Sequence, residues 1–182
     1  MFKNRKRKNG FTLVELLVVI AIIGILAAVV APNAFKAIEK SKVSAAESDY
    51  RAIKTAALTY YSDVGAWPVN TAAAKGFVTD PTVAAGSPAA TAVTGWNGPY
   101  IERWPSKNPW GGSYVYHNNP STLPSNVGIS TSTKYIVLDN VNNEAIKKLE
   151  ADLDGNTATS SDSGVVRFTT DATTCYLVIS DQ

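Results

Sequence analysis

The chain has 182 residues, of which 45% are hydrophobic and 18% charged, and its formal net charge is +2. This composition excludes a disordered or fibrous protein, and the length allows one domain, with or without a membrane segment. Five of the 17 Lys and Arg residues precede Gly10, so a chain without that head would hold 12 basic and 15 acidic residues, a net charge of about −3. Because no cluster of cations would remain to neutralise phosphates, we expect no nucleic-acid partner.

A short basic head runs directly into a long apolar segment. Residues 3–8 supply the five cations, and only Thr12, Glu15 and one glycine interrupt the apolar character of residues 11–31. At 1.5 Å per residue, a helix of this length reaches roughly 30 Å, the thickness of a bilayer core. The segment exceeds the apolar region of a secretory signal peptide, and no Ala-x-Ala site follows it before Lys36. We expect a single-pass membrane helix with its basic head in the cytoplasm.

Glu15 is the residue that a plain membrane anchor does not explain. A carboxylate at membrane depth costs about 2.5–3.5 kcal/mol on insertion scales, so a cation should compensate it in the working state. A cut between Gly10 and Phe11 would create an amine four residues away. A helix holds its own amine on a neighbouring turn, whereas the amine of another copy, shifted along the axis, can pair equally well. That stagger leads to an open-ended filament.

These residues resemble a known family. The basic head, Gly10, the string Phe-Thr-Leu-Val-Glu at 11–15 and an apolar run that ends near Pro32 are similar to the class III signal of type IV prepilins and type II secretion pseudopilins. The resemblance implies cleavage after Gly10 by a membrane-embedded prepilin peptidase, N-methylation of Phe11, and use of Glu15 to recruit and align subunits. It also implies that the apolar segment leaves the bilayer and becomes the filament core.

The helix is expected to continue beyond the membrane. Gly24 and Pro32 are at positions where helices of this family loosen, and proline favours a kink by its own chemistry. An apolar stripe follows at alternating steps of three and four and predicts an amphipathic helix to about residue 61, before Gly65. Its members are Val43, Ala46, Tyr50, Ile53, Ala57 and Tyr60. Glu47 and Arg51 are placed for an ion pair on the wet side.

The segment after this helix divides into a loop and an aromatic patch. Residues 71–94 are rich in Ala, Thr, Pro and Gly and almost uncharged, which indicates a long surface loop. Residues 98–105 and 108–116 combine Trp, Tyr, Pro and Gly, typical of aromatic packing around tight turns. Together with residues 60–68, this patch is similar to the corresponding part of the major pseudopilin of type II secretion.

The remaining sequence predicts a small sheet and one short helix. β-Branched and aromatic runs bounded by turn residues predict four strands. These are Ser113–His117, Lys134–Leu138, Val165–Thr169 and Cys175–Ile179. Asn143 is placed to cap a helix over Glu144–Glu150. We therefore expect an α+β fold, a type IV pilin-like roll, in which the long helix packs on a small antiparallel sheet.

One loop has residues that suit a metal ion. Asp152, Asp154 and Asn156, with Asp162 downstream, place oxygen ligands around a glycine turn, and the opening resembles the start of an EF-hand calcium loop. Ser163 stands where such a loop would close with Glu. Two interpretations stay open, a calcium site and an ordinary Asp/Asn/Gly turn.

We expect no enzyme. His117 is the only histidine and Cys175 the only cysteine, and the chain has no Walker loop, zinc spacing or GxGxxG motif. An apolar context predicts that Cys175 is a small buried side chain.

The sequence is therefore interpreted as a structural subunit with four parts: a cleaved leader over 1–10, a filament-core helix over 11–32, its amphipathic half over 33–61 and a head over 62–182. We expect a homopolymer, either a type IV pilus or a type II secretion pseudopilus, with a minor subunit that binds a ligand at a filament tip as the alternative. The expected partners are further copies, the prepilin peptidase and N-methyltransferase, the inner-membrane assembly platform and, before assembly, membrane lipid. The assembled form would be extracellular or within the envelope.

Overall fold

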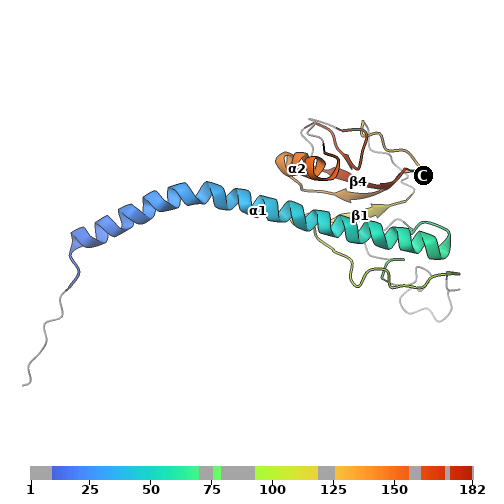
Figure 1. Ribbon diagram of the computed structural model, residues 1–182, viewed down its shortest axis with the longest axis horizontal. Helices are drawn as coiled ribbons and strands as arrows, with labels where there is room; N and C mark the ends of the chain where they lie inside the picture. Colours follow the sequence, from blue (N-terminus) through green and yellow to red (C-terminus); the bar gives the residue numbers. More distant parts are fainter. Residues whose placement is uncertain are drawn as a thin grey trace, which may run out of the picture. The chain divides into compact units, whose positions relative to one another are not determined.

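The computed structural model describes residues 10–69, 76–78, 93–118, 126–155, 161–170 and 173–181 (Figure 1). The chain divides into two compact units, one up to Glu39 and one from Lys40 onward. Most of the predicted loop 71–94 lies outside the described residues. Asn156 of the candidate calcium loop also lies outside them.

Helix α1 spans Leu13–Val64, as the long apolar and amphipathic runs predict. It begins immediately after Thr12 and passes through Pro32 without losing its helical assignment. It ends at Gly65, which adopts a positive φ of 74° and donates its N–H to the Tyr61 carbonyl at 2.9 Å. This is the left-handed closing residue for which glycine is preferred at helix C-termini.

The first unit is an apolar helix whose large side chains are exposed. Leu13, Ile25 and Phe35 each leave two thirds or more of their surface uncovered, at 78%, 68% and 68%. By length and composition this helix can cross a membrane, and its apolar stretch is exposed in the single chain. Exposed apolar surface on this scale indicates a lipid or protein environment.

The second unit contains a four-stranded antiparallel sheet in the order β1-β2-β4-β3. The strands are β1 (Tyr114–His117), β2 (Lys134–Leu138), β3 (Val166–Arg167) and β4 (Cys175–Ser180). Three of the four match the predicted strands to within one residue. The prediction of Val165–Thr169 was too long, because Phe168 leaves the ladder and forms an isolated bridge with Ser161.

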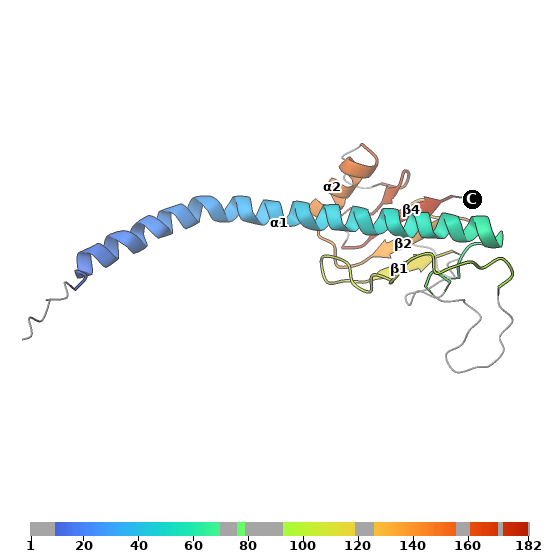
Figure 2. The ribbon, with the colours of Figure 1, turned by 60° about the horizontal axis from the view of Figure 1, so that its bottom comes forward.

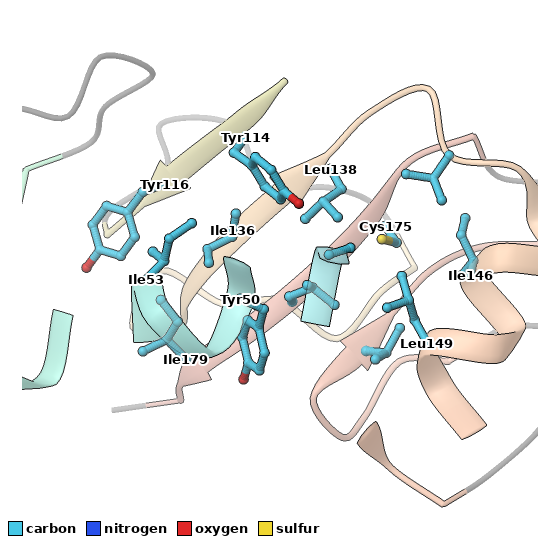
Figure 3. Packing of buried hydrophobic residues seen from close by; sticks show 14 of the residues in the cluster. Tyr50, Ile53, Tyr114, Tyr116, Ile136, Leu138, Ile146, Leu149, Cys175 and Ile179 are labelled. Atoms are coloured by element: carbon cyan, nitrogen blue, oxygen red, sulfur yellow. The ribbon is translucent and has the colours of Figure 1, made fainter. Parts of the chain in front are cut away.

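The head half of α1 lies along this sheet in both views (Figures 1 and 2). The buried residues of the helix are the predicted stripe with the addition of Ala56: Val43, Ala46, Tyr50, Ile53, Ala56, Ala57 and Tyr60. Figure 3 shows Tyr50 and Ile53 packed among side chains of β1, β2 and β4. Complete burial of a large apolar side chain contributes about 1.5–3 kcal/mol, so this stripe is the main attachment of α1 to the head.

Helix α2 spans Asn143–Leu153 and buries Ile146 and Leu149 in the same core. Its N-cap is Asn142, whose side-chain oxygen accepts the Ala145 N–H at 2.8 Å. The prediction of Asn143 as the cap was wrong by one residue. Two adjacent asparagines give the same sequence signal, and the extended backbone of the first decides which one caps.

The opposite face of the sheet has a smaller cluster of Val127, Ile129, Tyr135 and Val178. The ring of His117 stacks on that of Tyr135 with centroids 5.1 Å apart. Burial lowers the pKa of His117, which is consistent with a neutral packed ring. Cys175 is fully buried in the main core, and burial raises the pKa of its thiol to about 12. The prediction that Cys175 is a small buried side chain is confirmed.

Candidate functional site

The N-terminal turn of α1 holds the candidate assembly residue Glu15 in a reciprocal set of hydrogen bonds with Thr12. The Thr12 N–H and Thr12 Oγ1 donate to the same carboxylate oxygen, Glu15 Oε2, at 2.8 and 2.7 Å. The Glu15 N–H donates in return to Thr12 Oγ1 at 3.2 Å. Because α1 begins at Leu13, Thr12 is its N-cap and Glu15 its third helical residue. This is a capping box.

The capping box gives Glu15 partners within its own subunit. The cost of burying a carboxylate depends on whether it is hydrogen-bonded, and two donors converge on this one. A negative charge in the first turn also favours the helix dipole. Glu15 therefore has a structural role in the single subunit. Any role between subunits comes in addition to it.

Sequence reasoning missed the part that Thr12 plays. The signal was present, because Thr-x-x-Glu directly before an apolar run is the sequence signature of a capping box. The interruption by Thr12 was noted in the sequence, but the interpretation of Glu15 rested on its charge alone. Both residues are exposed in the single chain, so they are open to a neighbouring molecule.

The candidate cleavage site lies just outside the helix. Gly10 and Phe11 precede the first helical residue, and Phe11 exposes 89% of its surface. A Cβ placed on Gly10 would meet no atom within 4 Å, so packing within the described chain does not require glycine there. A requirement for glycine would then come from an enzyme that binds this segment.

Two of the candidate calcium residues, Asp152 and Asp154, have side chains engaged with other groups. Asp152 pairs with Lys148 at 3.7 Å. Asp154 accepts the N–H groups of Val165 at 2.9 Å and Val166 at 2.7 Å, one on each carboxylate oxygen. These bonds tie the end of α2 to the start of β3, as the turn interpretation expects. Asn156 lies outside the described residues, so the calcium site stays a prediction.

Asp162 contributes to this region through its backbone. A Cβ placed on Gly128 would lie only 1.8 Å from the Asp162 carbonyl oxygen. Gly128 also has a positive φ of 60°. The two segments can approach this closely because Gly128 has no side chain. Within the described residues, no group of three or more His, Cys, Asp or Glu side chains is arranged to hold a metal ion.

The aromatic and proline patch forms packed turns, as predicted. Asn108 is central, because its side-chain oxygen accepts the N–H groups of Trp110 at 3.0 Å and Gly112 at 3.1 Å. Its amide nitrogen donates to the Asp139 carbonyl at 2.6 Å. A Cβ on Gly112 would lie 2.2 Å from that same carbonyl oxygen, so glycine is required for the close approach.

Comparison with known proteins identifies the family. Residues 5–31 match the prokaryotic N-terminal methylation motif, and residues 37–129 match the C-terminal domain of PilW. The type II secretion system core protein G of Pseudomonas aeruginosa is 36% identical over 113 residues, which cover 62% of this chain and 75% of that protein. This chain belongs to the family of pilins and type II secretion pseudopilins. The Vibrio cholerae core protein G is likewise 36% identical over 114 residues, 63% of this chain and 73% of the relative.

Two type IV pilins are also similar to parts of this chain. The type IV major pilin protein PilA of Myxococcus xanthus is 47% identical over 57 residues, which cover 31% of this chain and 26% of the pilin. The major type IV pilin PilA1 from Clostridium difficile has a TM-score of 0.44 at 23% identity, covering 78% of this chain and 96% of its own.

Membership confirms the α+β pilin-like fold and the general function. The chain is a structural subunit of the pilin and pseudopilin class, and its relatives are structural proteins. The methylation motif and these relatives imply a polymer and a prepilin peptidase. The apolar N-terminal helix fits a membrane-anchored protein that forms filaments.

Proposed function

We propose that this chain is a major pseudopilin, inserted with residues 1–10 in the cytoplasm, cut after Gly10, methylated on Phe11 and polymerised through Glu15. In this proposal the carboxylate of one subunit pairs with the new amine of its neighbour, while the apolar helices pass from lipid into the filament core. The observation that carries it is the position of Glu15, a hydrogen-bonded and exposed carboxylate at the start of an apolar helix within a methylation motif.

The partners follow from these steps. Processing requires a prepilin peptidase with N-methyltransferase activity, and extraction from the bilayer requires an inner-membrane assembly platform. The lipid bilayer itself surrounds the exposed apolar side chains before assembly. The main protein partner is another copy of the chain.

The capping box makes a sharp experiment available for the role of Glu15. Gln is accepted at the third position of a capping box, so Glu15→Gln keeps the cap and removes only the charge. Glu15→Ala removes both. If the charge pairs with a neighbour's amine, both variants should insert and be processed but form no polymer that chemical cross-linking of the cell envelope detects. Normal filaments from Glu15→Gln would contradict the pairing and leave Glu15 only its role in the cap.

A pseudopilus is favoured over a surface pilus by the extent of the matches. Core protein G relatives align with 60–63% of the chain, whereas the pilin PilA aligns with 31%. Deletion of the chain should stop export of secreted proteins, with export restored by the full-length gene. Unchanged export together with loss of long surface filaments, seen by electron microscopy with antibody to this chain, would assign it to a pilus instead.

A further inference from the structure

Arg167 is a buried cation on the two-residue strand β3. Its side chain is 6% exposed, and its neighbours Val166 and Phe168 both belong to the main core. Because successive side chains of a strand point to opposite faces, Arg167 points away from that core. A buried charge is costly unless it is paired and hydrogen-bonded, so the partners of Arg167 show what keeps it there.

The guanidinium of Arg167 binds three separate segments of the head. Its Nε donates to the Gly164 carbonyl at 3.1 Å and its Nη1 to the Gly128 carbonyl at 2.7 Å. Its Nη2 donates to Asp181 Oδ2 at 2.8 Å, and this contact is also an ion pair. These acceptors precede β3, precede β2 and follow β4. A planar guanidinium has donors on all three nitrogens in a fixed arrangement, so it can hold the three acceptors at once.

Asp181 connects the two strands on either side of β4. Arg167 of β3 donates to one of its carboxylate oxygens, and the Thr133 hydroxyl, directly before β2, donates to the other at 3.2 Å. The Ser132 hydroxyl donates to the Asp181 backbone carbonyl, also at 3.2 Å. Because β4 lies between β2 and β3 in the sheet, this one residue holds three strands together where β4 ends.

The backbone pairing of β3 with β4 is short. Two residues of β3, Val166 and Arg167, pair with β4, and the Val178 N–H donates to the Val165 carbonyl at 2.7 Å. Strands of globular proteins usually have about 3–10 residues, so this ladder needs other support. β3 is also the last strand of the sheet order. If it moved away, β4 would present unpaired backbone groups to another chain.

We propose that Arg167 and Asp181 form an ionic latch that keeps β3 closed on β4, so that this edge of the sheet does not pair with another copy of the chain. The latch supplies side-chain bonds where the backbone ladder is short. Loss of Asp181 would leave a buried guanidinium without its carboxylate, and loss of Arg167 would leave Asp181 held from the β2 side alone. Either change should release β3.

Hydrogen exchange of the full chain in detergent, measured by NMR, tests the latch. The Val178 N–H reports whether β3 stays on β4, and the Ile146 N–H in α2 reports the rest of the head. Arg167→Met and Asp181→Ala should each speed exchange at Val178 about tenfold, the effect of one lost hydrogen bond to a charged group, and leave Ile146 unchanged. Arg103→Met, the matched control at an exposed arginine, should change neither amide.

The two residues should behave as one unit. The double variant, Arg167→Met with Asp181→Ala, should exchange the Val178 N–H no faster than the faster of the two single variants, because each change already opens the same latch. Light scattering of the same samples should show a larger mass for the variants than for the unchanged chain, since an open edge of β4 can pair with another copy.

Several results would overturn the inference. Unchanged exchange at Val178 in Asp181→Ala would refute the latch, and this variant alters a side chain that is 57% exposed, so the test does not depend on the folding of Arg167→Met. Equal acceleration at Val178 and Ile146 would show a general loss of stability. Additive effects in the double variant would show that the two residues act separately. Faster exchange at Val178 without added mass would refute the protection of the sheet edge.

Discussion

Glu47 on α1 and Asp152 on α2 face each other where the two helices meet, and each is paired with a basic residue four positions away on its own helix. Glu47 lies 3.6 Å from Arg51, and Asp152 lies 3.7 Å from Lys148. Burial and the Asp152 carboxylate raise the pKa of Glu47 above its ordinary value of 4.5, against the opposing effect of Arg51 and Lys148. The two carboxyl groups therefore lie close enough for Asp152 to disfavour the charged form of Glu47.

The raised pKa of Glu47 predicts how the head responds to pH. A group with a higher pKa in the folded chain contributes stability that is full below 4.5 and is lost as the pH rises through the folded value. Glu47→Gln, which resembles the protonated form, should raise the melting temperature at pH 7. It should also flatten the decline in melting temperature above pH 4.5. Thermal melts of the full chain in detergent across this range measure it. Glu102→Gln, an exposed glutamate, should leave the profile unchanged.

The sequence predicted those parts of the fold in which the same residue pattern recurs along the chain. The Tyr50 and Ile53 stripe was predictable because burial on one side of a helix recurs every three or four residues. The meeting of Glu47 with Asp152 was not, because it depends on how α2 packs on α1, and no local pattern encodes that contact. Likewise Gly112 shows its purpose only once Asp139 is brought against it. At the candidate site, the interpretation of Glu15 rested on its charge alone. The capping box is recognised only when Thr12 and Glu15 are considered together.

The cap of α2 gives a test between two neighbouring asparagines. Asn142→Ala removes the acceptor for the Ala145 N–H and should lower the free energy of unfolding by about 1 kcal/mol. Asn143→Ala is the matched control, because its side-chain oxygen is buried without a hydrogen-bond partner in the described structure. Asn143→Ala should lower the free energy of unfolding by less than Asn142→Ala does. Denaturant unfolding of both variants decides the order, and a larger loss from Asn143→Ala would contradict the assigned cap.

The Tyr50 hydroxyl makes a hydrogen bond across the core, and we expect this bond to contribute to the free energy of unfolding. Its hydroxyl donates to the Val178 carbonyl at 2.6 Å, linking α1 to β4. Tyr50→Phe would leave that buried carbonyl without its donor, which costs about 1–3 kcal/mol. Tyr61→Phe changes a tyrosine of the same helix that is 44% exposed and should stay within about 0.5 kcal/mol of the unchanged chain. Equal losses from the two variants, measured by denaturant unfolding, would refute the assignment.

Substitution of Asp154 tests the two interpretations of its loop, an ordinary turn and a calcium site. Its carboxylate accepts the N–H groups of Val165 and Val166, and hydrogen bonds to a charged group are worth about 1.5–3 kcal/mol each. Asp154→Ala should therefore destabilise the head even in excess EDTA. If the loop also binds calcium, added calcium should raise the melting temperature of the unchanged chain and not that of the variant. A variant as stable as the parent in EDTA would show that the backbone bonds contribute little.

Substitution of Gly10 tests whether an enzyme recognises the junction before α1. A side chain on Gly10 meets open space, so Gly10→Leu should insert normally while accumulating as the uncut precursor. Gly24→Ala is the matched control, because this glycine also has open space around it yet lies within the helix. It should be cut and methylated as usual. Mass spectrometry of the N-terminal peptide reports both events. A methylated Phe11 in the Gly10→Leu variant would mean that cleavage does not depend on this glycine, and the proposed processing site would have to be abandoned.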